Sequence, residues 1–503
     1  MAVSEKMVAI EGSVSSKKRD FDVLILGTGF SGLGMAIRLR QKGYRDFAVI
    51  ERAQDVGGTW YANHYPGCAC DVPSHVYSFS FAPNPNWTRM FSPQNEIQTY
   101  LRRCAENFSI MPHIHFGTEV LETNWDEAKK RWITKTSNGI YSSRILVAGT
   151  GALSEAKLPD FPGIEDFRGE MFHSANWNHE VDLEGKRIAV IGTGASTIQF
   201  VPEIQPKAAH LDVYMRTAPW IMPHPDRPVT NMERSIYKFF PAAQLTMRAA
   251  IFWARETFVL AFTSQRKIMK IGEFVARKHL AKQVPDPELR RKLTPNFEMG
   301  CKRVLLSNKF YPTLGKENVD LVIDPIAKVG KDSIISYDGT KREADVIIFG
   351  TGFQVAEMPF SERVRGKEGK FLSEQWKGSP RAHMGTTVPG FPNFFVLMGP
   401  NTGLGHNSMV YMIESQIAYV MDAIKLMERN DSVAIEPKQE ALDQFVGDLD
   451  KKMEGTVWTS GCASWYLDSQ GRNPTLWPGF SWEFRKATKK LKESEYSFLK
   501  AAL

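Results

Sequence analysis

Short apolar runs that end in glycine or in a charged residue recur along the chain and predict buried parallel strands. The first, residues 21–26 (FDVLIL), leads through a glycine-rich turn into a helical pattern over residues 33–40. Residues 48–50 give the next strand, and 187–191 (RIAVI) begins a second series that continues at 211–215. Continuous apolar runs of this length are typical of strands in parallel sheets covered by helices. The pattern therefore predicts an α/β protein.

The first glycine-rich turn has the sequence Gly-Thr-Gly-Phe-Ser-Gly at residues 27–32. Gly-x-Gly-x-x-Gly between a strand and a helix is typical of dinucleotide sites: its glycines make the turn, admit the pyrophosphate and let helix pack on strand. The second strand ends in Glu51, and a carboxylate there can bind the hydroxyl groups of an unphosphorylated ribose. We expect this half to bind FAD or NAD through Gly27, Gly29, Phe30, Ser31, Gly32 and Glu51.

A second turn of the same kind follows the strand at 187–191, with the residues Gly192, Thr193, Gly194, Ala195, Ser196 and Thr197. Thr197 replaces the third glycine, which predicts slightly looser packing of helix on strand. The next strand ends in Arg216-Thr217 instead of an acid, and a guanidinium can bind a 2′-phosphate, although a strand-end arginine can also be merely solvated. Together the two turns predict two Rossmann-like dinucleotide-binding domains and an FAD enzyme that is reduced by NADPH.

Residues 57–71, GGTWYANHYPGCACD, combine paired glycines, aromatic planes and a carboxylate directly after the first nucleotide unit. Glycine pairs permit a close approach of the backbone to a flat group. The run resembles the fingerprint of type I Baeyer–Villiger monooxygenases: a small residue, Gly-x-Trp, then aromatic-Pro-Gly, with Asp four residues later. Every defining position is filled here, by Gly57, Gly58, Trp60, Tyr65, Pro66, Gly67 and Asp71.

Residues 167–178 resemble the second fingerprint of the same family, Phe-x-Gly-x-x-x-His-x-x-x-Trp. Asn178 departs from the Pro or Asp that usually follows the tryptophan. Related flavin-containing N- and S-monooxygenases carry Tyr or Phe at the position of Trp177, so the tryptophan favours the Baeyer–Villiger branch. His173 lies between the two nucleotide units, and we expect it to couple the domains rather than to transfer protons.

The resemblance implies a reaction and a set of site residues. NADPH reduces FAD, oxygen forms a C4a-peroxyflavin, and this attacks a ketone to give an ester or a lactone. Arg303 is the implied catalytic residue, because a permanent cation stabilises the peroxyflavin anion, and Asp71 would hold and orient it. Lys302 would join Arg216 at the 2′-phosphate. The further cofactor contacts implied are Gly58, Thr59, Trp60, Tyr77, Val120, Thr217 and Trp465.

Three other hypotheses stay open from the residues alone. The first is a flavin-containing N- or S-monooxygenase that oxidises amines or sulfides, and the second is a non-catalytic NADP(H)-sensing flavoprotein. The third is a dithiol reductase using Cys68 and Cys70, but one residue between cysteines is poor geometry for a disulfide. The five cysteines are odd in number and scattered, which predicts no disulfide framework. We expect His406 to pack or to form hydrogen bonds, since the sequence shows no partner acid.

Composition limits the partners. A net charge of +7 suits anionic cofactors, and no clustered basic stripe argues for nucleic acid. The most apolar stretch, residues 249–262, is interrupted by Arg255 and Glu256 and is too short for a membrane span. The polar start lacks a secretory signal. We expect a cytoplasmic monomer or weak homodimer that acts with O2 on a small-molecule ketone or, as a side activity, a sulfide.

A chain of 503 residues is too long for one hydrophobic core and needs several domains. Further strands are expected at 145–150 and 345–353, and the segments 399–408 and 465–466 are expected to line the substrate pocket. The landmarks predict a disordered tail at 1–20, an FAD-binding domain at 21–151 and 386–503, an NADP-binding domain at 156–222 and 300–385, and a helical insertion at 223–299.

Overall fold

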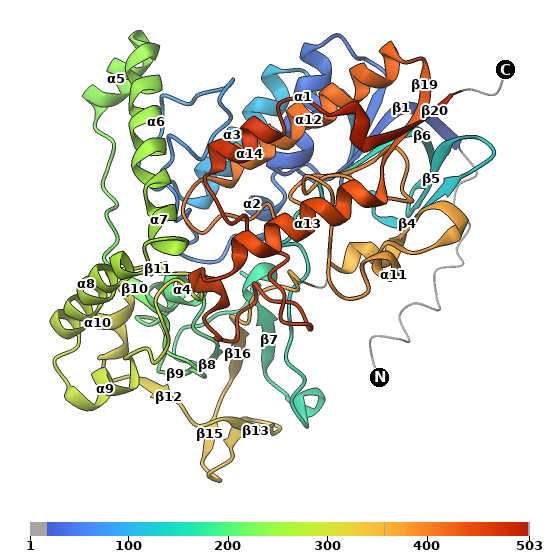
Figure 1. Ribbon diagram of the computed structural model, residues 1–503. Helices are drawn as coiled ribbons and strands as arrows, with labels where there is room; N and C mark the ends of the chain where they lie inside the picture. Colours follow the sequence, from blue (N-terminus) through green and yellow to red (C-terminus); the bar gives the residue numbers. More distant parts are fainter. Residues whose placement is uncertain (1–17, 357, 501–503) are drawn as a thin grey trace.

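Two sheets, each with a parallel core, organise the chain and lie in different regions of the molecule (Figure 1). The computed structural model describes residues 18–356 and 358–500. The larger sheet has the order β17-β4-β5-β6-β1-β2-β3, and β18 also pairs with β6. Its strands are β1 (Lys18–Leu26), β2 (Phe47–Ile50), β3 (Ile114–His115), β4 (Val120–Asp126), β5 (Arg131–Thr136), β6 (Gly139–Ala148), β17 (Val364–Arg365) and β18 (Phe394–Val396).

Apolar runs place the strands of this sheet in the core. Residues 23–26 of β1 are at most 2 % exposed, because β1 lies between β2 and β6, parallel to both, with side chains packed on both faces. The predicted first helix is α1 (Phe30–Gln41), which begins directly at the glycine turn. Together with α3 (Gln94–Asn107) and α12 (Met409–Arg429), it covers one face of the larger sheet.

The smaller sheet is parallel throughout and has the order β12-β9-β8-β16-β7. Its strands are β7 (Glu170–His173), β8 (Arg187–Ile191), β9 (His210–Tyr214), β12 (Val319–Val322) and β16 (Val346–Phe349). One face packs against α4 (Thr197–Ile204) and α10 (Phe310–Leu314). The other face packs against the antiparallel strands β13 (Ile326–Val329), β14 (Ser333–Ser336) and β15 (Lys341–Glu343). The predicted α/β architecture with two dinucleotide units is confirmed.

The helical insertion follows the third strand of the second unit and runs along the left edge of Figure 1. It contains α5 (Asn231–Phe239), α6 (Pro241–Glu256), α7 (Phe258–Phe262), α8 (Lys267–Gln283) and α9 (Pro287–Lys292). A Thr230–Glu233 capping box begins α5. The short parallel strands β10 (Ile221–Met222) and β11 (Leu305–Leu306) pair where the chain leaves and re-enters the insertion.

The C-terminal part returns to the larger sheet. Its further elements are α11 (Leu372–Trp376), β19 (Ser432–Pro437), α13 (Gln439–Met453), α14 (Ser481–Ala487) and β20 (Tyr496–Lys500). The short helix α2 (Thr59–Ala62) belongs to the N-terminal half. Strands β19 and β20 form an antiparallel pair. Single 3-10 turns lie at Met111–His113, Ile164–Asp166, Ser174–Asn176, Pro359–Arg363, Lys367–Gly369, Val457–Thr459 and Glu493–Glu495.

Two predicted boundaries differ from the structure. Strand β1 begins at Lys18, so residues 18–20 belong to the sheet, where they pair with residues 140–142, while 1–17 lie outside the described residues. Residues 18–20 are polar and lie at the amino end of the strand, so no apolar pattern indicates this extension. Strand β17 pairs with β4, so the chain has re-entered the larger sheet by residue 364 and not at 386. A two-residue pairing has no hydrophobic period that a sequence pattern could show.

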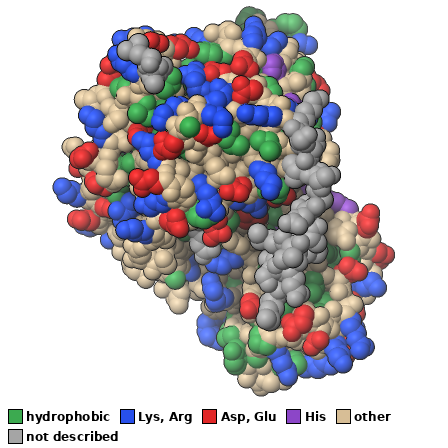
Figure 2. Space-filling view, turned by 90° about the vertical axis from the view of Figure 1, so that its right-hand side faces the viewer, with side chains coloured by type: hydrophobic (Ala, Val, Ile, Leu, Met, Phe, Trp, Pro, Cys, Tyr) green, Lys and Arg blue, Asp and Glu red, His purple; other side chains and the backbone are tan. Residues whose placement is uncertain are grey.

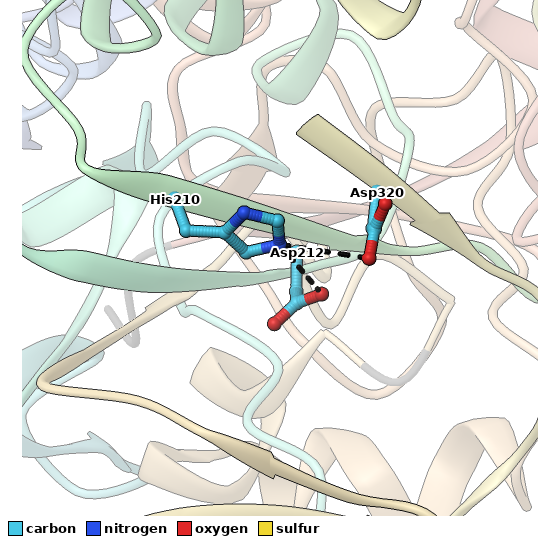
Figure 3. A group of neighbouring side chains, drawn as sticks. All are labelled: His210, Asp212 and Asp320. Atoms are coloured by element: carbon cyan, nitrogen blue, oxygen red, sulfur yellow. Dashed lines mark ion pairs between the residues drawn. The ribbon is translucent and has the colours of Figure 1, made fainter. Parts of the chain in front are cut away.

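His210 and Asp212 on β9 and Asp320 on the edge strand β12 lie within metal-ligand spacing in the smaller sheet (Figure 3). Asp212 and Asp320 are direct partners on β9 and β12, an arrangement in which like charges repel. Arg342 on β15 donates from Nη1 to both carboxylates at 2.8 Å. Burial raises the pKa of Asp212, and the Arg342 charge opposes that rise. The arginine satisfies the pair, so the cluster is an ion-pair network that ties three strands together.

Candidate active site

Both glycine turns open into one cavity of about 2070 Å³. Of the residues expected at the nucleotide sites, all line this cavity except Gly32 and Thr197, and Arg303 lines it as well. The parallel strands explain the convergence. Strands of one sheet that run the same way end at the same edge, and here the carboxyl edges of the two sheets face a common space.

The glycines of the two motifs fall into two groups, those packed against protein backbone and those that face the cavity. A Cβ on the first glycine of each motif, Gly27 or Gly192, would lie 2.7 or 2.5 Å from a backbone oxygen of the protein, and one on Gly32 would lie 1.9 Å from the Gly27 oxygen. Those three positions are closed by the protein itself. A Cβ on Gly29 or Gly194 would meet its nearest protein atom at 3.7 Å. The second glycine of each motif therefore leaves its space to the cavity, which fits a bound pyrophosphate.

Glu51 is held at the end of β2 by three hydrogen bonds. One carboxylate oxygen accepts hydrogen bonds from the Thr28 backbone nitrogen at 2.9 Å and from its hydroxyl at 2.7 Å. The other accepts from the Ala53 nitrogen at 2.8 Å. The side chain is 7 % exposed and borders the cavity. Since a carboxylate has about four acceptor positions and three are occupied, one position on Oε1 remains for a ribose hydroxyl.

The Gly57–Asp71 loop joins the two nucleotide units. A Cβ on Gly58 would lie 2.9 Å from the Gly29 Cα. The backbone of the first turn therefore requires glycine at position 58, whereas the sequence had suggested that a flat ligand requires it. Trp60 donates from Nε1 to the Tyr77 hydroxyl at 3.0 Å. Further along, the Tyr65 hydroxyl donates to Gln199 Oε1 at 2.9 Å. The loop thus reaches from the FAD-type turn to helix α4 of the second unit.

Gln199 is a residue that the sequence reasoning missed. Its amide nitrogen also donates to the Ala69 oxygen at 3.0 Å, so one side chain holds the loop at two points. Trp177 of the second fingerprint lies 5.2 Å from the Phe200 ring and 6.5 Å from the Tyr65 ring. The two fingerprints therefore meet on α4. Its position two residues after a glycine motif is the only signal that Gln199 offers in the sequence.

Arg303 and Asp71 form a hydrogen-bonded ion pair in the cavity wall. Asp71 Oδ2 accepts from Arg303 Nη2 at 2.5 Å and from Nε at 3.0 Å. The Asp71 charge raises the pKa of Arg303 above its ordinary value. Burial opposes ionisation of Asp71, but the charge and hydrogen bonds of Arg303 outweigh it and lower the carboxyl pKa. The pair stays charged, with the guanidinium facing the cavity.

A second cation, Arg255, lies near this pair. In the sequence, Arg255 stands out only because it interrupts the apolar stretch 249–262. Arg255, on α6, contributes charge that also lowers the pKa of Asp71. Burial lowers the pKa of Arg255, and Asp71 opposes that effect. Tyr466 lies near the same pair, and burial raises its pKa to about 12. The insertion and the C-terminal loop both contribute to the surroundings of Arg303.

Arg216 and Lys302 form a cationic corner of the same cavity. Both line it, and burial together with the Arg216 charge lowers the pKa of Lys302. Within the described residues neither side chain forms an ion pair with an acid. Two cations that approach each other without a carboxylate are arranged for a dianionic group such as a phosphate. Trp465, 42 % exposed, borders the cavity from the C-terminal loop.

Comparison with known proteins agrees with this geometry. Residues 19–371 match the family model described as flavin-binding monooxygenase-like. The chain belongs to this family. A "Baeyer-Villiger monooxygenase" from Pseudomonas aeruginosa is 50 % identical over 481 residues, 95 % of this chain and 91 % of that protein.

Two solved structures extend the similarity to the whole fold. A closed crystal structure of cyclohexanone monooxygenase covers 96 % of this chain and 100 % of its own, with a TM-score of 0.87 and 27 % identity. An oxidized steroid monooxygenase bound to NADP gives the same coverage, with a TM-score of 0.85 and 30 % identity. The resemblance to Baeyer–Villiger monooxygenases is confirmed, and the N- or S-oxidising alternative is not favoured.

The monooxygenase contains a disulfide that the cysteine count did not predict. Cys301, next to Lys302 and Arg303, is bonded to Cys462, with 6.4 Å between their Cα atoms. The bond joins the segment that carries Lys302 and Arg303 to the loop that carries Trp465. Cys68, Cys70 and Cys104 are free and buried. The expectation of no disulfide is wrong because 161 residues separate the partners, and pairing at that distance is set by the tertiary fold.

His173 and His406 are both buried and hydrogen-bonded within the protein. His173 is buried outside the cavity lining, and its Nδ1 accepts from the Ala175 nitrogen at 3.0 Å. Burial lowers the pKa of His173 to about 4, so it is neutral near pH 7. His406 does have a partner acid, contrary to the sequence reasoning: its Nε2 lies 3.1 Å from Glu256 Oε1. The acid comes from α6, 150 residues away.

Proposed function

We propose that the protein uses NADPH and O2 to insert one oxygen atom beside a ketone carbonyl, which gives an ester or a lactone. The observation that carries the proposal is the Arg303–Asp71 pair on a cavity shared by two dinucleotide turns. Bound FAD supplies the oxygen-activating chemistry, and NADPH supplies the reducing equivalents.

Arg303 supplies a fixed positive charge at the reacting centre. Negative charge develops on oxygen when a carbonyl is attacked, and a preorganised cation lowers the energy of that state. The guanidinium never loses its proton in the working pH range, because its intrinsic pKa exceeds about 12 and Asp71 raises it further. Asp71 is a positioning residue: two hydrogen bonds to one of its oxygens fix the plane of the guanidinium.

Arg216 and Lys302 select the phosphorylated nicotinamide cofactor. Their neighbouring charges bind the 2′-phosphate that distinguishes NADPH from NADH. In the first unit Glu51 has the opposite role: its carboxylate suits the free ribose hydroxyls of FAD and repels a 2′-phosphate. The charge difference between the two strand ends assigns one cofactor to each turn. Trp465, which lines the cavity, would cover the nicotinamide half of the bound cofactor.

Product analysis tests the proposal directly. The holoenzyme is supplied with NADPH, ¹⁸O2 and a panel of cyclic, linear and aryl ketones, and products are identified by mass spectrometry. We expect an ester or lactone that carries one labelled oxygen beside the original carbonyl. Oxidation of sulfides or amines with no ester from any ketone would place the enzyme in the N- and S-oxidising branch instead.

A further inference from the structure

Exposed apolar side chains concentrate on the helical insertion. Among the described residues, 19 large apolar side chains are exposed, and 12 of them lie between residues 231 and 283, on α5 to α8. They include Phe239 and Phe240 at the α5–α6 junction, 72 % and 67 % exposed, and Phe274 on α8, 67 % exposed. Single exposed apolar residues are ordinary, but a concentration on one subdomain indicates a binding surface.

Helix α6 has its polarity reversed relative to a solvent-facing helix. Its exposed positions carry no charge and are Pro241, Ala242, Leu245, Thr246, Ala249, Ala250, Trp253 and Ala254. Its charged residues point into the protein. Arg248 donates to the His75 oxygen at 2.5 Å, and Glu256 accepts from the Asn407 amide at 2.7 Å. Outward positions of a surface helix are normally charged, so this face is built for contact with something apolar.

The charges around the apolar face have one sign. Between residues 231 and 283 six basic side chains are exposed: Lys238, Lys267, Lys270, Arg277, Lys278 and Lys282. The three acids of this segment are withdrawn from solvent, with Glu256 and Glu273 buried and Glu233 paired to Arg227. The opposite side of the molecule differs, since Figure 2 shows acidic and basic side chains interspersed there. Along α5 to α8 the exposed apolar residues are thus flanked by exposed cations, whereas the exposed acids of the insertion, Asp286 and Glu288, lie at α9.

We propose that α5 to α8 form a docking surface for a bilayer that contains anionic lipids. Phe and Trp side chains beside lysines are the composition of helices that lie in the headgroup region, where rings enter the acyl boundary and lysines contact lipid phosphates. A second copy of the chain is less suited, because two such faces would bring like charges together. Insertion across the bilayer is not involved: no described helix is long and apolar enough to span it.

The docking surface would place the enzyme at a membrane, and this inference does not depend on the proposed oxygenation. The buried side of α6 reaches the catalytic region, through Arg255 near Asp71 and through Glu256 with His406. The same helix thus contacts the active-site wall with one face and presents the docking surface with the other. An enzyme held in this way would receive apolar substrates from the lipid phase.

Vesicle flotation tests the proposal without reference to catalysis. The full-length holoenzyme is mixed with vesicles of phosphatidylcholine alone, or of phosphatidylcholine with an equal part of phosphatidylglycerol. We expect flotation with the anionic vesicles, decreasing as salt is raised. Leu245→Gln combined with Trp253→Gln should lower the bound fraction roughly tenfold. Lys267→Gln with Lys278→Gln should lower it through charge alone.

Matched controls lie outside the insertion. Tyr337→Gln removes an aromatic side chain that is 76 % exposed, and Lys316→Gln removes an exposed cation; both should bind like the wild type. FAD content verifies folding of every variant. Failure of the wild type to float, or an equal loss in the control variants, overturns the proposal. A dimer that the Leu245→Gln, Trp253→Gln variant converts to monomers, without vesicle binding by the wild type, would assign the surface to a second copy.

Discussion

Thr197 occupies the space that Gly350 leaves. A Cβ added to Gly350 would lie 2.0 Å from the Thr197 hydroxyl oxygen, and Thr197 is completely buried. Thr197 stands where the glycine motif has its third glycine, and Gly350 follows β16 without a side chain. The larger residue at one position and the glycine at the other fit together across the junction of α4 and β16. The looser packing predicted from Thr197 alone is therefore wrong, since the glycine on the neighbouring strand makes the room.

Gly350→Ala should destabilise the protein by about 1–3 kcal/mol, because the new methyl group overpacks a closed site. In the Thr197→Gly background the same change should cost much less, which gives a coupling energy of about 0.5–3 kcal/mol. Thermal unfolding of the two single variants and the double variant measures both quantities. Gly447→Ala is the control, since no atom lies within 4 Å of its Cβ position. Additive effects would show that the two sites are independent.

Arg303→Ala should reduce ester formation by a factor of about a thousand or more, because one preorganised charge is lost at the reacting centre. The variant should still bind FAD and be reduced by NADPH, since neither process needs Arg303. Its oxygen consumption should end in hydrogen peroxide. Asp71→Asn should show a smaller loss, because the arginine remains but is less firmly held. Undiminished ester yield in Arg303→Ala would remove the residue from the mechanism.

Removal of either cation at the cationic corner should weaken discrimination between the nicotinamide cofactors. A hydrogen bond to a charged group contributes about 1.5–3 kcal/mol, so Arg216→Ala should lower kcat/KM for NADPH about ten- to a hundredfold. The loss should lie mainly in KM. Values for NADH should change little, and they serve as the internal control. If NADH suffers equally, Arg216 acts on something other than the 2′-phosphate.

Stability should fall as pH is lowered from about 6.5 to about 4. Burial lowers the pKa of His173 to about 4. Between about pH 6.5 and about pH 4, His173 is therefore protonated in the unfolded chain but neutral in the folded protein. The contribution is fully present above the unfolded value and is lost on acidification, at up to about 1.4 kcal/mol per pH unit. His173→Asn, whose amide oxygen can still accept from the Ala175 nitrogen, should flatten the profile. Urea unfolding between pH 4.5 and pH 7.5, a range of roughly three units, gives both curves.

The Cys301–Cys462 bond should leave three titratable thiols of five when the unreduced protein is denatured. Closing a long loop stabilises a protein by about 2–4 kcal/mol, so Cys462→Ser should lower the unfolding temperature. Alkylation of thiols during cell lysis, followed by peptide mapping, tests whether the pair is oxidised in the cell. Five thiols in the denatured protein would contradict the bond. Cys104→Ser is the matched control, since Cys104 is buried but free.

What the sequence determined by itself is local or strongly patterned. Strand β8 was predicted to the residue, since a buried strand is a continuous apolar run bounded by breakers. The glycine turns could be predicted because strand, Gly-x-Gly-x-x-Gly and helix form a local sequence pattern, although the backbone atoms that close Gly27 and Gly192 belong to Gly149 and Gly350. The partnership of Asp71 with Arg303 was also predicted, although 232 residues separate them, because a family fingerprint records a contact that spacing alone does not show.

The tertiary structure alone decided relationships between segments that have no common period. Cys301 meets Cys462, Glu256 meets His406, and Gln199 holds the Gly57–Asp71 loop, and in each case the partner lies more than a hundred residues away. The reversed polarity of α6 was equally hidden, since a helical period shows that two faces differ but not which of them meets the protein. Such choices depend on what packs where. Only the assembled sheets, insertion and C-terminal loop fix them.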